Sequence, residues 1–158
     1  MPHEGARVDI QAALTVIGRR PPERVRFEDK RDLTLNLFQA NLQRADFSGS
    51  LKRVVLSVAH LEGTTLRGAD LEGAILNRAS LKGAMLVEAN LEGAHLYGVN
   101  LEHANLREAI LKGASLFDSD LSKVGYLDQN GLAAALGNAT VMLPKGTPRP
   151  ASWPEPRA

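Results

Sequence analysis

The chain has 158 residues, which gives room for one domain with a single core. Nineteen Lys and Arg balance eighteen Asp and Glu, so the formal charge of +1 predicts no general attraction to nucleic acid or to a membrane surface. Cysteine is absent, which excludes disulfides and thiolate metal ligands.

The first 31 residues are predicted to form a capping helix and a charged connector. Residues 9–19 place apolar side chains on one helical face, with Asp9 as a possible N-cap and Gly18 as a stop. The start of the chain lacks the basic residues and apolar run of a secretion signal, and its apolar stretch is too short to cross a bilayer. We therefore expect a soluble cytoplasmic protein with no membrane partner.

A five-residue repeat occupies the middle of the chain, over residues 32–123. An earlier run of Leu37, Leu42 and Phe47 joins it through Leu51 after a four-residue step, so one residue is missing near Gly49. The repeated leucines, which we expect to form the core, are Leu56, Leu61, Leu66, Leu71, Leu76, Leu81, Leu86, Leu91, Leu96, Leu101, Leu106, Leu111, Leu116 and Leu121.

Period five fits neither an unbroken helix nor an unbroken strand. A helix would rotate successive leucines by about 140°, and a strand would alternate them between its two faces. The chain must therefore turn once in each pentad. A small residue two places before each leucine then points inward with it, and the frequent glycine two places after it supplies the corner.

Four such sides close a square coil, so residues twenty apart should stack at about 4.8 Å. The pattern predicts an all-β parallel β-helix of about four and a half coils. The open ends of such a coil require covers.

Repeats such as Ala69-Asp70-Leu71-Glu72-Gly73 and Ala89-Asn90-Leu91-Glu92-Gly93 resemble the signature of the pentapeptide repeat family. This resemblance implies a right-handed quadrilateral β-helix. It implies little about function, because one fold hosts many functions.

Residues 124–158 are predicted to form a second cap and a proline-rich tail. Asp128 to Asn138 is predicted as a short helix that turns Leu132, Ala135 and Leu136 inward and ends at Gly137. For the tail two alternatives stay open: Trp153 folds back onto the coil, or the tail is disordered. Both flanks resemble those of certain actinobacterial-type pentapeptide domains, which implies a bacterial source. In that group the domain often follows a membrane segment, and we expect a free-standing version here.

No arrangement of residues predicts catalysis, a cofactor or a metal. Among the histidines, His60 and His103 share one side of the coil but lie about two coils apart, near 10 Å, which is too far for a shared metal. No nucleophile, base and orienting group come together, and corners account for the glycines. We therefore expect no enzyme, no metal and no cofactor.

One side of the predicted coil carries a sizeable apolar and aromatic patch. Its members are Ile75, His95, Tyr97 and Phe117, with Tyr97 stacked against Phe117. Contact with a partner is one interpretation, and cover by the terminal segments or no role is the other.

The leading prediction is therefore a non-catalytic protein-binding or scaffolding module. The alternative, implied by the family resemblance, is a DNA-mimicking modulator of DNA gyrase of the quinolone-resistance kind. Mimicry requires a markedly negative rod, whereas residues 32–123 contain eleven acidic and nine basic residues. Direct nucleic-acid binding is not expected, and a homodimer through a coil end stays open.

Overall fold

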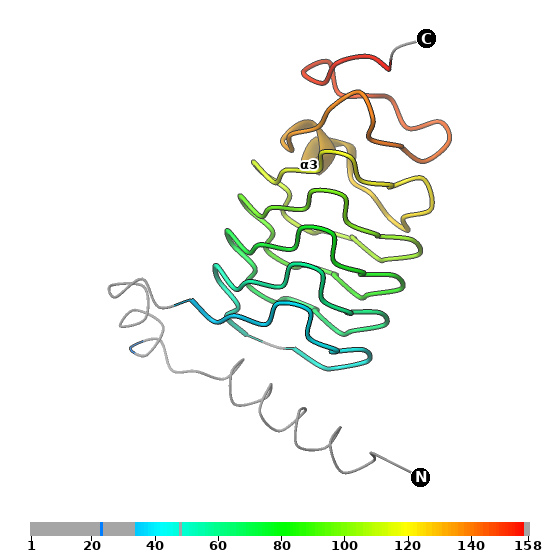
Figure 1. Ribbon diagram of the computed structural model, residues 1–158. Coiled ribbons are helices and arrows are strands. Elements are labelled where there is room, and N and C mark those ends of the chain that lie inside the picture. The colour runs from blue at the N-terminus through cyan, green and yellow to red at the C-terminus, as the bar shows by residue number, and fades with distance from the viewer. Residues whose placement is uncertain (1–22, 24–33, 48, 157–158) are drawn as a thin grey trace.

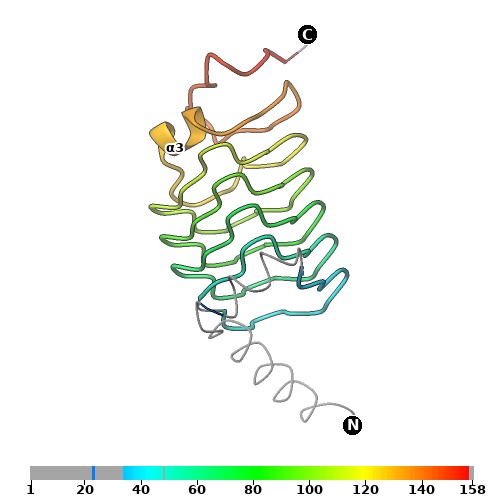
Figure 2. The same cartoon turned by 90° about the vertical axis from the view of Figure 1, so that its left-hand side faces the viewer.

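The computed structural model describes residue 23 and residues 34–47 and 49–156. The predicted helix over 9–19 and most of the connector lie outside these residues. The described chain winds into a stack of four-sided coils, and helix α3 (Gln129–Ala133) lies at the C-terminal end of that stack (Figures 1 and 2). Within the described residues, no helix is long and apolar enough to cross a membrane.

The coils are joined by parallel β-bridges rather than by long strands. Val55 pairs with Ile75, and Ile75 pairs with His95, so partners lie twenty residues apart. The hydrogen bonds run along the stack, as from Leu56 N to Ile75 O at 2.7 Å. The predicted all-β solenoid is therefore present, with one short extended piece on each side of each coil.

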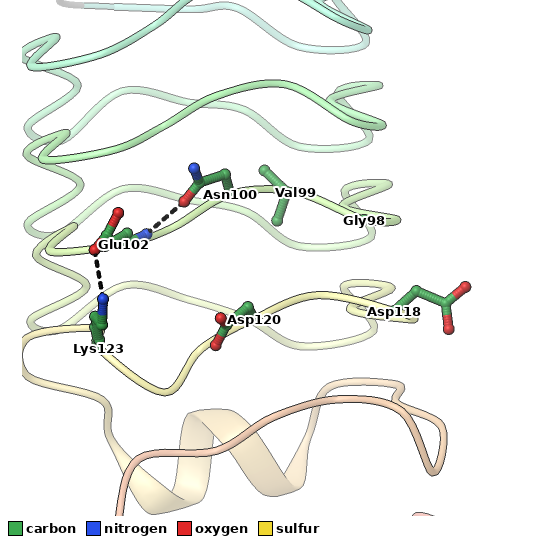
Figure 3. Close-up of a pocket in the computed structure, with 7 residues that line it drawn as sticks. All are labelled: Gly98, Val99, Asn100, Glu102, Asp118, Asp120 and Lys123. Carbon is green, nitrogen blue, oxygen red and sulfur yellow. Dashed lines mark hydrogen bonds and ion pairs between the residues drawn. The ribbon is translucent and has the colours of Figure 1, made fainter.

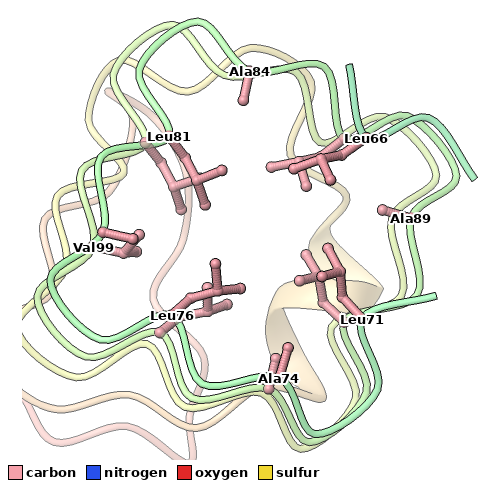
Figure 4. Close-up of a cluster of buried hydrophobic side chains, with 14 of the residues drawn as sticks. Leu66, Leu71, Ala74, Leu76, Leu81, Ala84, Ala89 and Val99 are labelled. Carbon is pink, nitrogen blue, oxygen red and sulfur yellow. The ribbon is translucent and has the colours of Figure 1, made fainter. Parts of the chain in front are cut away.

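The core is a column of leucines with small residues beside it. Leu66, Leu71, Leu76 and Leu81 point from the four sides toward the centre of one coil (Figure 4). The repeated leucines from Leu56 to Leu121 are at most 3% exposed. Alanines two places before them are buried as well, because the inward side of an extended segment repeats every second residue.

Each corner is a tight turn with one residue in the left-handed region. In one corner Ala84 N donates to Leu81 O at 2.9 Å, and the intervening Gly83 has φ +67°. Non-glycine residues take the same conformation at other corners, for example Glu88 with φ 60°. Glycine is frequent there because it has no Cβ to strain this conformation.

The four-residue step near Gly49 makes the first coil one residue shorter than the others. Asn36 pairs with Val55, nineteen residues later, whereas Ser50 pairs with Asp70 at the regular distance of twenty. Gly49 absorbs the difference with φ 111°, far from the value near 60° at the regular corners.

At the C-terminal end, helix α3 is inserted into the coil. Asp128 is its N-cap, and its carboxylate accepts from Gly131 N at 2.8 Å. The coil resumes after the helix, with Ser115 paired to Leu136. This step is twenty-one residues, because the segment with the helix, from Gly125 to Leu136, takes eleven residues where two regular sides take ten.

Two features of the predicted C-terminal helix are wrong. The helix ends at Ala133 with Ala134 as its C-cap, so it is shorter than 128–138 and does not end at Gly137. Leu132 and Ala135 are buried as predicted, but Leu136 is 52% exposed. The extra residue shifts the register by one, and such a shift moves a side chain to the opposite face.

The tail folds back onto the last coil, the first of the two alternatives. Trp153 is only 4% exposed, and its indole Nε1 donates to Ala135 O at 3.0 Å. Arg149 donates from Nη1 to Asn138 O and from Nη2 to Val141 O. These contacts order the proline-rich segment.

Candidate protein-binding face

Side chains from all the stacked coils line one side of the rod. The core leucines of this side include Leu76, Leu96 and Leu116, and the residues on either side of each point outward. A continuous series of parallel bridges runs along it: Asn36, Val55, Ile75, His95, Ser115 and Leu136. We call this side the apolar face and define it by Phe38, Val55, Ile75, His95, Tyr97, Phe117 and Leu136.

The structure brings all four predicted residues onto this face. Ile75 and His95 form a bridge between neighbouring coils. Tyr97 and Phe117 also lie in neighbouring coils, since Gly98 N donates to Phe117 O at 2.9 Å. Tyr97 and Phe117 are 38% and 37% exposed, and Ile75 is half-buried.

Sequence reasoning missed two large members of this face, one in its first coil and one in its last. Phe38 and Leu136 are both 52% exposed. Counting in steps of twenty misplaces both, because the first coil has nineteen residues and the step from Ser115 to Leu136 has twenty-one. The missing residue near Gly49 is visible in the sequence and could have been used to place Phe38 on this side. The sequence gives no comparable indication of the extra residue that comes with α3, so the position of Leu136 could not be predicted.

Tyr97 is held in place by three neighbours. Its backbone N–H donates to Asn77 Oδ1 at 3.1 Å, and the guanidinium carbon of Arg78 lies 5.8 Å from its ring centroid. Its hydroxyl contributes to lowering the pKa of the Asp118 carboxyl group. The ring is therefore a rigid, partly exposed aromatic group with one polar end, a type enriched at protein interfaces.

Asp118 links Tyr97 to the C-terminal loop. Its carboxylate accepts from the Thr140 hydroxyl and from Asn138 Nδ2, the latter at 2.7 Å. Hydrogen bonds from Thr140, Asn138 and Tyr97, in that order of effect, lower the pKa of Asp118 below its usual value. The edge of the apolar face is thus fixed by the ionised form of this carboxyl group.

The other sides of the rod carry paired charges of opposite sign. Lys52 Nζ lies 2.6 Å from Glu72 Oε2, and Lys112 Nζ lies 2.7 Å from Glu92 Oε1. A third arrangement centres on Glu102, which pairs with Lys82 and Lys123. Hydrogen bonds from Lys123 first and then Lys82 lower the pKa of Glu102 to about 2. Exposed pairs of this kind contribute little to stability individually.

A shallow polar depression lies beside this charged arrangement. Figure 3 shows Glu102 joined to Lys123 and, through its backbone, to the Asn100 side chain, while Asp118 points away from them. The depression is lined by Gly98, Val99, Asn100, Glu102, Asp118, Asp120 and Lys123. Glu102 pairs with Lys123, and Asp120 accepts from Ser122 N. Asp118 accepts instead from the C-terminal loop.

The histidines of the described residues lie apart from one another. His60 Nδ1 is 3.6 Å from Glu62 Oε1, and His103 Nε2 is 3.6 Å from Glu102 Oε1. His95 lies on the apolar face. In the part of the chain that the structure describes, no three His, Asp or Glu residues are grouped as a metal site.

Comparison with known proteins identifies the family. The sequence model of the family "Pentapeptide repeats" matches residues 50–93 and 84–122. A pentapeptide repeat protein of the Arabidopsis thaliana thylakoid lumen has a similar structure, with 30% identity, a TM-score of 0.59 and coverage of 63% of this chain and 71% of that chain. The chain belongs to the pentapeptide repeat family. No curated protein sequence matches it.

Two further pentapeptide repeat structures are similar. Rfr23 of the cyanobacterium Cyanothece 51142 has 26% identity and a TM-score of 0.63, covering 78% of this chain and 99% of that one. QnrB1, a plasmid-mediated fluoroquinolone resistance protein, has 22% identity and a TM-score of 0.35, covering 70% of this chain and 58% of that one. The likeness to QnrB1 is too weak to carry an argument about function.

Membership of the pentapeptide repeat family indicates which kind of activity to expect. Pentapeptide repeat proteins are generally non-enzymatic structural or binding modules, and nothing in the comparisons indicates catalysis. The fold gives such proteins a rigid core, while the outward positions between the leucines differ in chemistry from side to side. In this chain three sides carry mainly charged and polar outward side chains, whereas the apolar face carries large apolar and aromatic ones.

Proposed function

We propose that the chain is a non-catalytic protein-binding module and that the apolar face is its contact surface. One observation carries the proposal: along this face the large side chains of Phe38, Tyr97, Phe117 and Leu136 are exposed, and those of Val55 and Ile75 are half-buried. Exposed apolar residues that are contiguous mark contact sites more often than scattered ones do.

The composition of the face fits another protein better than a small molecule or a nucleic acid. Tyr97 and Phe117 supply rigid aromatic area, and aromatic residues dominate the binding energy of many protein interfaces. Tyr97 is held by Asn77, Arg78 and Asp118, so it loses little conformational freedom on binding. None of the residues that define the face is Lys or Arg, the residue types on which phosphate contacts depend, and Arg78 beside it is placed over the Tyr97 ring.

The proposal is tested by comparing three forms of the full chain as bait for proteins of the native host. The face variant carries Tyr97→Ser and Phe117→Ser. The matched control carries Met85→Ser and Ile110→Ser, which remove exposed apolar side chains from the other sides; these are 44% and 49% exposed. Far-UV circular dichroism checks that each form is folded.

We expect the unaltered chain and the control to retain the same specific partner and the face variant to lose it. Retention of that partner by the folded face variant would show that the apolar face is not the contact surface. Equal loss by both variants would likewise contradict the proposal, because it would show no preference for this face.

The DNA-mimic alternative finds less support on the described surface. Its acidic groups are largely paired with bases, as in Lys52–Glu72 and Lys112–Glu92, so the rod does not carry a continuous negative charge. A gyrase supercoiling assay with and without a quinolone distinguishes the two functions. Inhibition or protection at stoichiometric concentration would favour mimicry over the proposal.

A further inference from the structure

The last coil ends in carbonyl groups that point away from the rod. In regular coils the carbonyl of the small inward residue accepts from the next coil, as Ala74 O does from His95 N at 2.8 Å. Leu136 N donates in this way to Ala114 O, and Met142 N donates to Ser119 O. By the same register, the carbonyls of Ala135 and Val141 face the coil that would follow.

The tail binds both of these carbonyls with side chains. Trp153 Nε1 donates to Ala135 O at 3.0 Å, and Arg149 Nη2 donates to Val141 O at 2.7 Å. An indole and a guanidinium thus occupy the places where backbone N–H groups of a further coil would donate.

Trp153 also fills the core position that the last coil leaves open. The pairing of Ser115 with Leu136 puts Gly137 in register with the core residue Leu116. A Cβ placed on Gly137 would lie 2.5 Å from both Cε2 and Cε3 of Trp153. The indole ring therefore occupies the space that a core leucine fills in the regular coils.

We propose that Arg149 to Trp153 form a strap that closes the C-terminal edge of the coil against association with a second copy of this chain. An uncovered edge presents a row of backbone donors and acceptors and is a template for pairing. The last coil also carries Leu136 and Met142, 52% and 53% exposed, which would add apolar contact.

A second copy is the partner whose edge fits. It has the same four-sided outline and the same spacing of backbone groups. The last coil presents backbone N–H donors as well as carbonyl acceptors at its outer edge. In regular coils the N–H of the core residue donates to the next coil, as Leu96 N does to Ser115 O. Two such edges related by a two-fold axis can therefore exchange hydrogen bonds. The strap itself creates little new edge, since Pro148, Pro150 and Pro154 lack an N–H donor.

The first experiment uses Gly137→Leu in the full chain. Gly137 lies outside the left-handed region, so leucine fits the backbone but competes with the Trp153 ring for one space. Trp153 is the single tryptophan, so its fluorescence reports on the strap directly. We expect a red-shifted emission, greater quenching by acrylamide, and a species of at least twice the wild-type mass in multi-angle light scattering.

The second variant, Arg149→Ala with Trp153→Ala, removes the strap contacts without enlarging Gly137, and Lys145→Ala is the matched control. We expect the double variant to associate and the Lys145→Ala control to keep the wild-type mass. A peptide of residues 144–156 added in trans should reverse the association of the double variant. Folded variants that keep the wild-type mass would overturn the proposal. Association that the peptide does not reverse would overturn it too, because the edge would then not be the contact.

Discussion

Leu86 and Leu136 offer a direct test of how the coil register controls stability. Leu86 is completely buried, and its stacked neighbours Leu66 and Leu106 are 1% and 2% exposed. Leu136 is 52% exposed in the outward position. The same substitution to alanine therefore removes the same atoms from a core position and from a surface position of one protein.

The expected costs differ by a factor of about three. Removing three buried carbon atoms at Leu86 loses about 2–3 kcal/mol of transfer free energy. The coils are tied to one another by hydrogen bonds on each side, so the cavity cannot close fully, and its residual volume raises the cost to about 3–4 kcal/mol. At Leu136 roughly half of the transfer term applies and no cavity forms, which gives about 1 kcal/mol.

Urea unfolding followed by far-UV circular dichroism measures both values, provided that the slopes of the two transitions agree. Leu86→Lys serves as a stronger version, because it buries an unpaired charge and should prevent folding of the rod. Equal costs for Leu86→Ala and Leu136→Ala, or a soluble and fully folded Leu86→Lys variant, would refute the register described here.

Two further predictions concern a corner and an exposed ion-pair cluster. Gly83 has φ +67° and open space around it, so Gly83→Ala should lower the free energy of unfolding by about 1 kcal/mol through backbone strain. Gly83→Asn should lower it less, since Asn tolerates this conformation. Equal values for the two variants in urea unfolding would exclude strain as the cause. Glu102 has a pKa lowered to about 2 from 4.5 by Lys123 and Lys82, so its contribution to stability is present above about pH 4.5 and is lost as the pH falls toward 2. Glu102→Gln should therefore be less stable than the wild type at neutral pH and equal to it near pH 2, and a difference that does not change with pH would contradict this assignment.

The apolar face shows how far side-by-side placement can be inferred from a repeat. Counting in twenties predicts that Ile75, His95, Tyr97 and Phe117 share one side. The bridge between Ile75 and His95 and the hydrogen bond from Gly98 N to Phe117 O place them there. The support of Tyr97 by Asp118 was not predictable, because Thr140 and Asn138 reach that carboxylate from the C-terminal loop.

The pentad by itself determined the core, the corners and the stacking of coils. Leucine at every fifth position has no regular alternative to a four-sided coil, so Leu76 and Leu96 had to point inward, and a residue of the type of Gly83 had to turn the chain. Only the tertiary structure decided how the coil ends. The segment with helix α3 takes up one residue more than two regular sides, which turns Leu136 outward and places Gly137 at the core position. Trp153 fills that position from sixteen residues further along, because a side chain can complete a core wherever the folded backbone brings it.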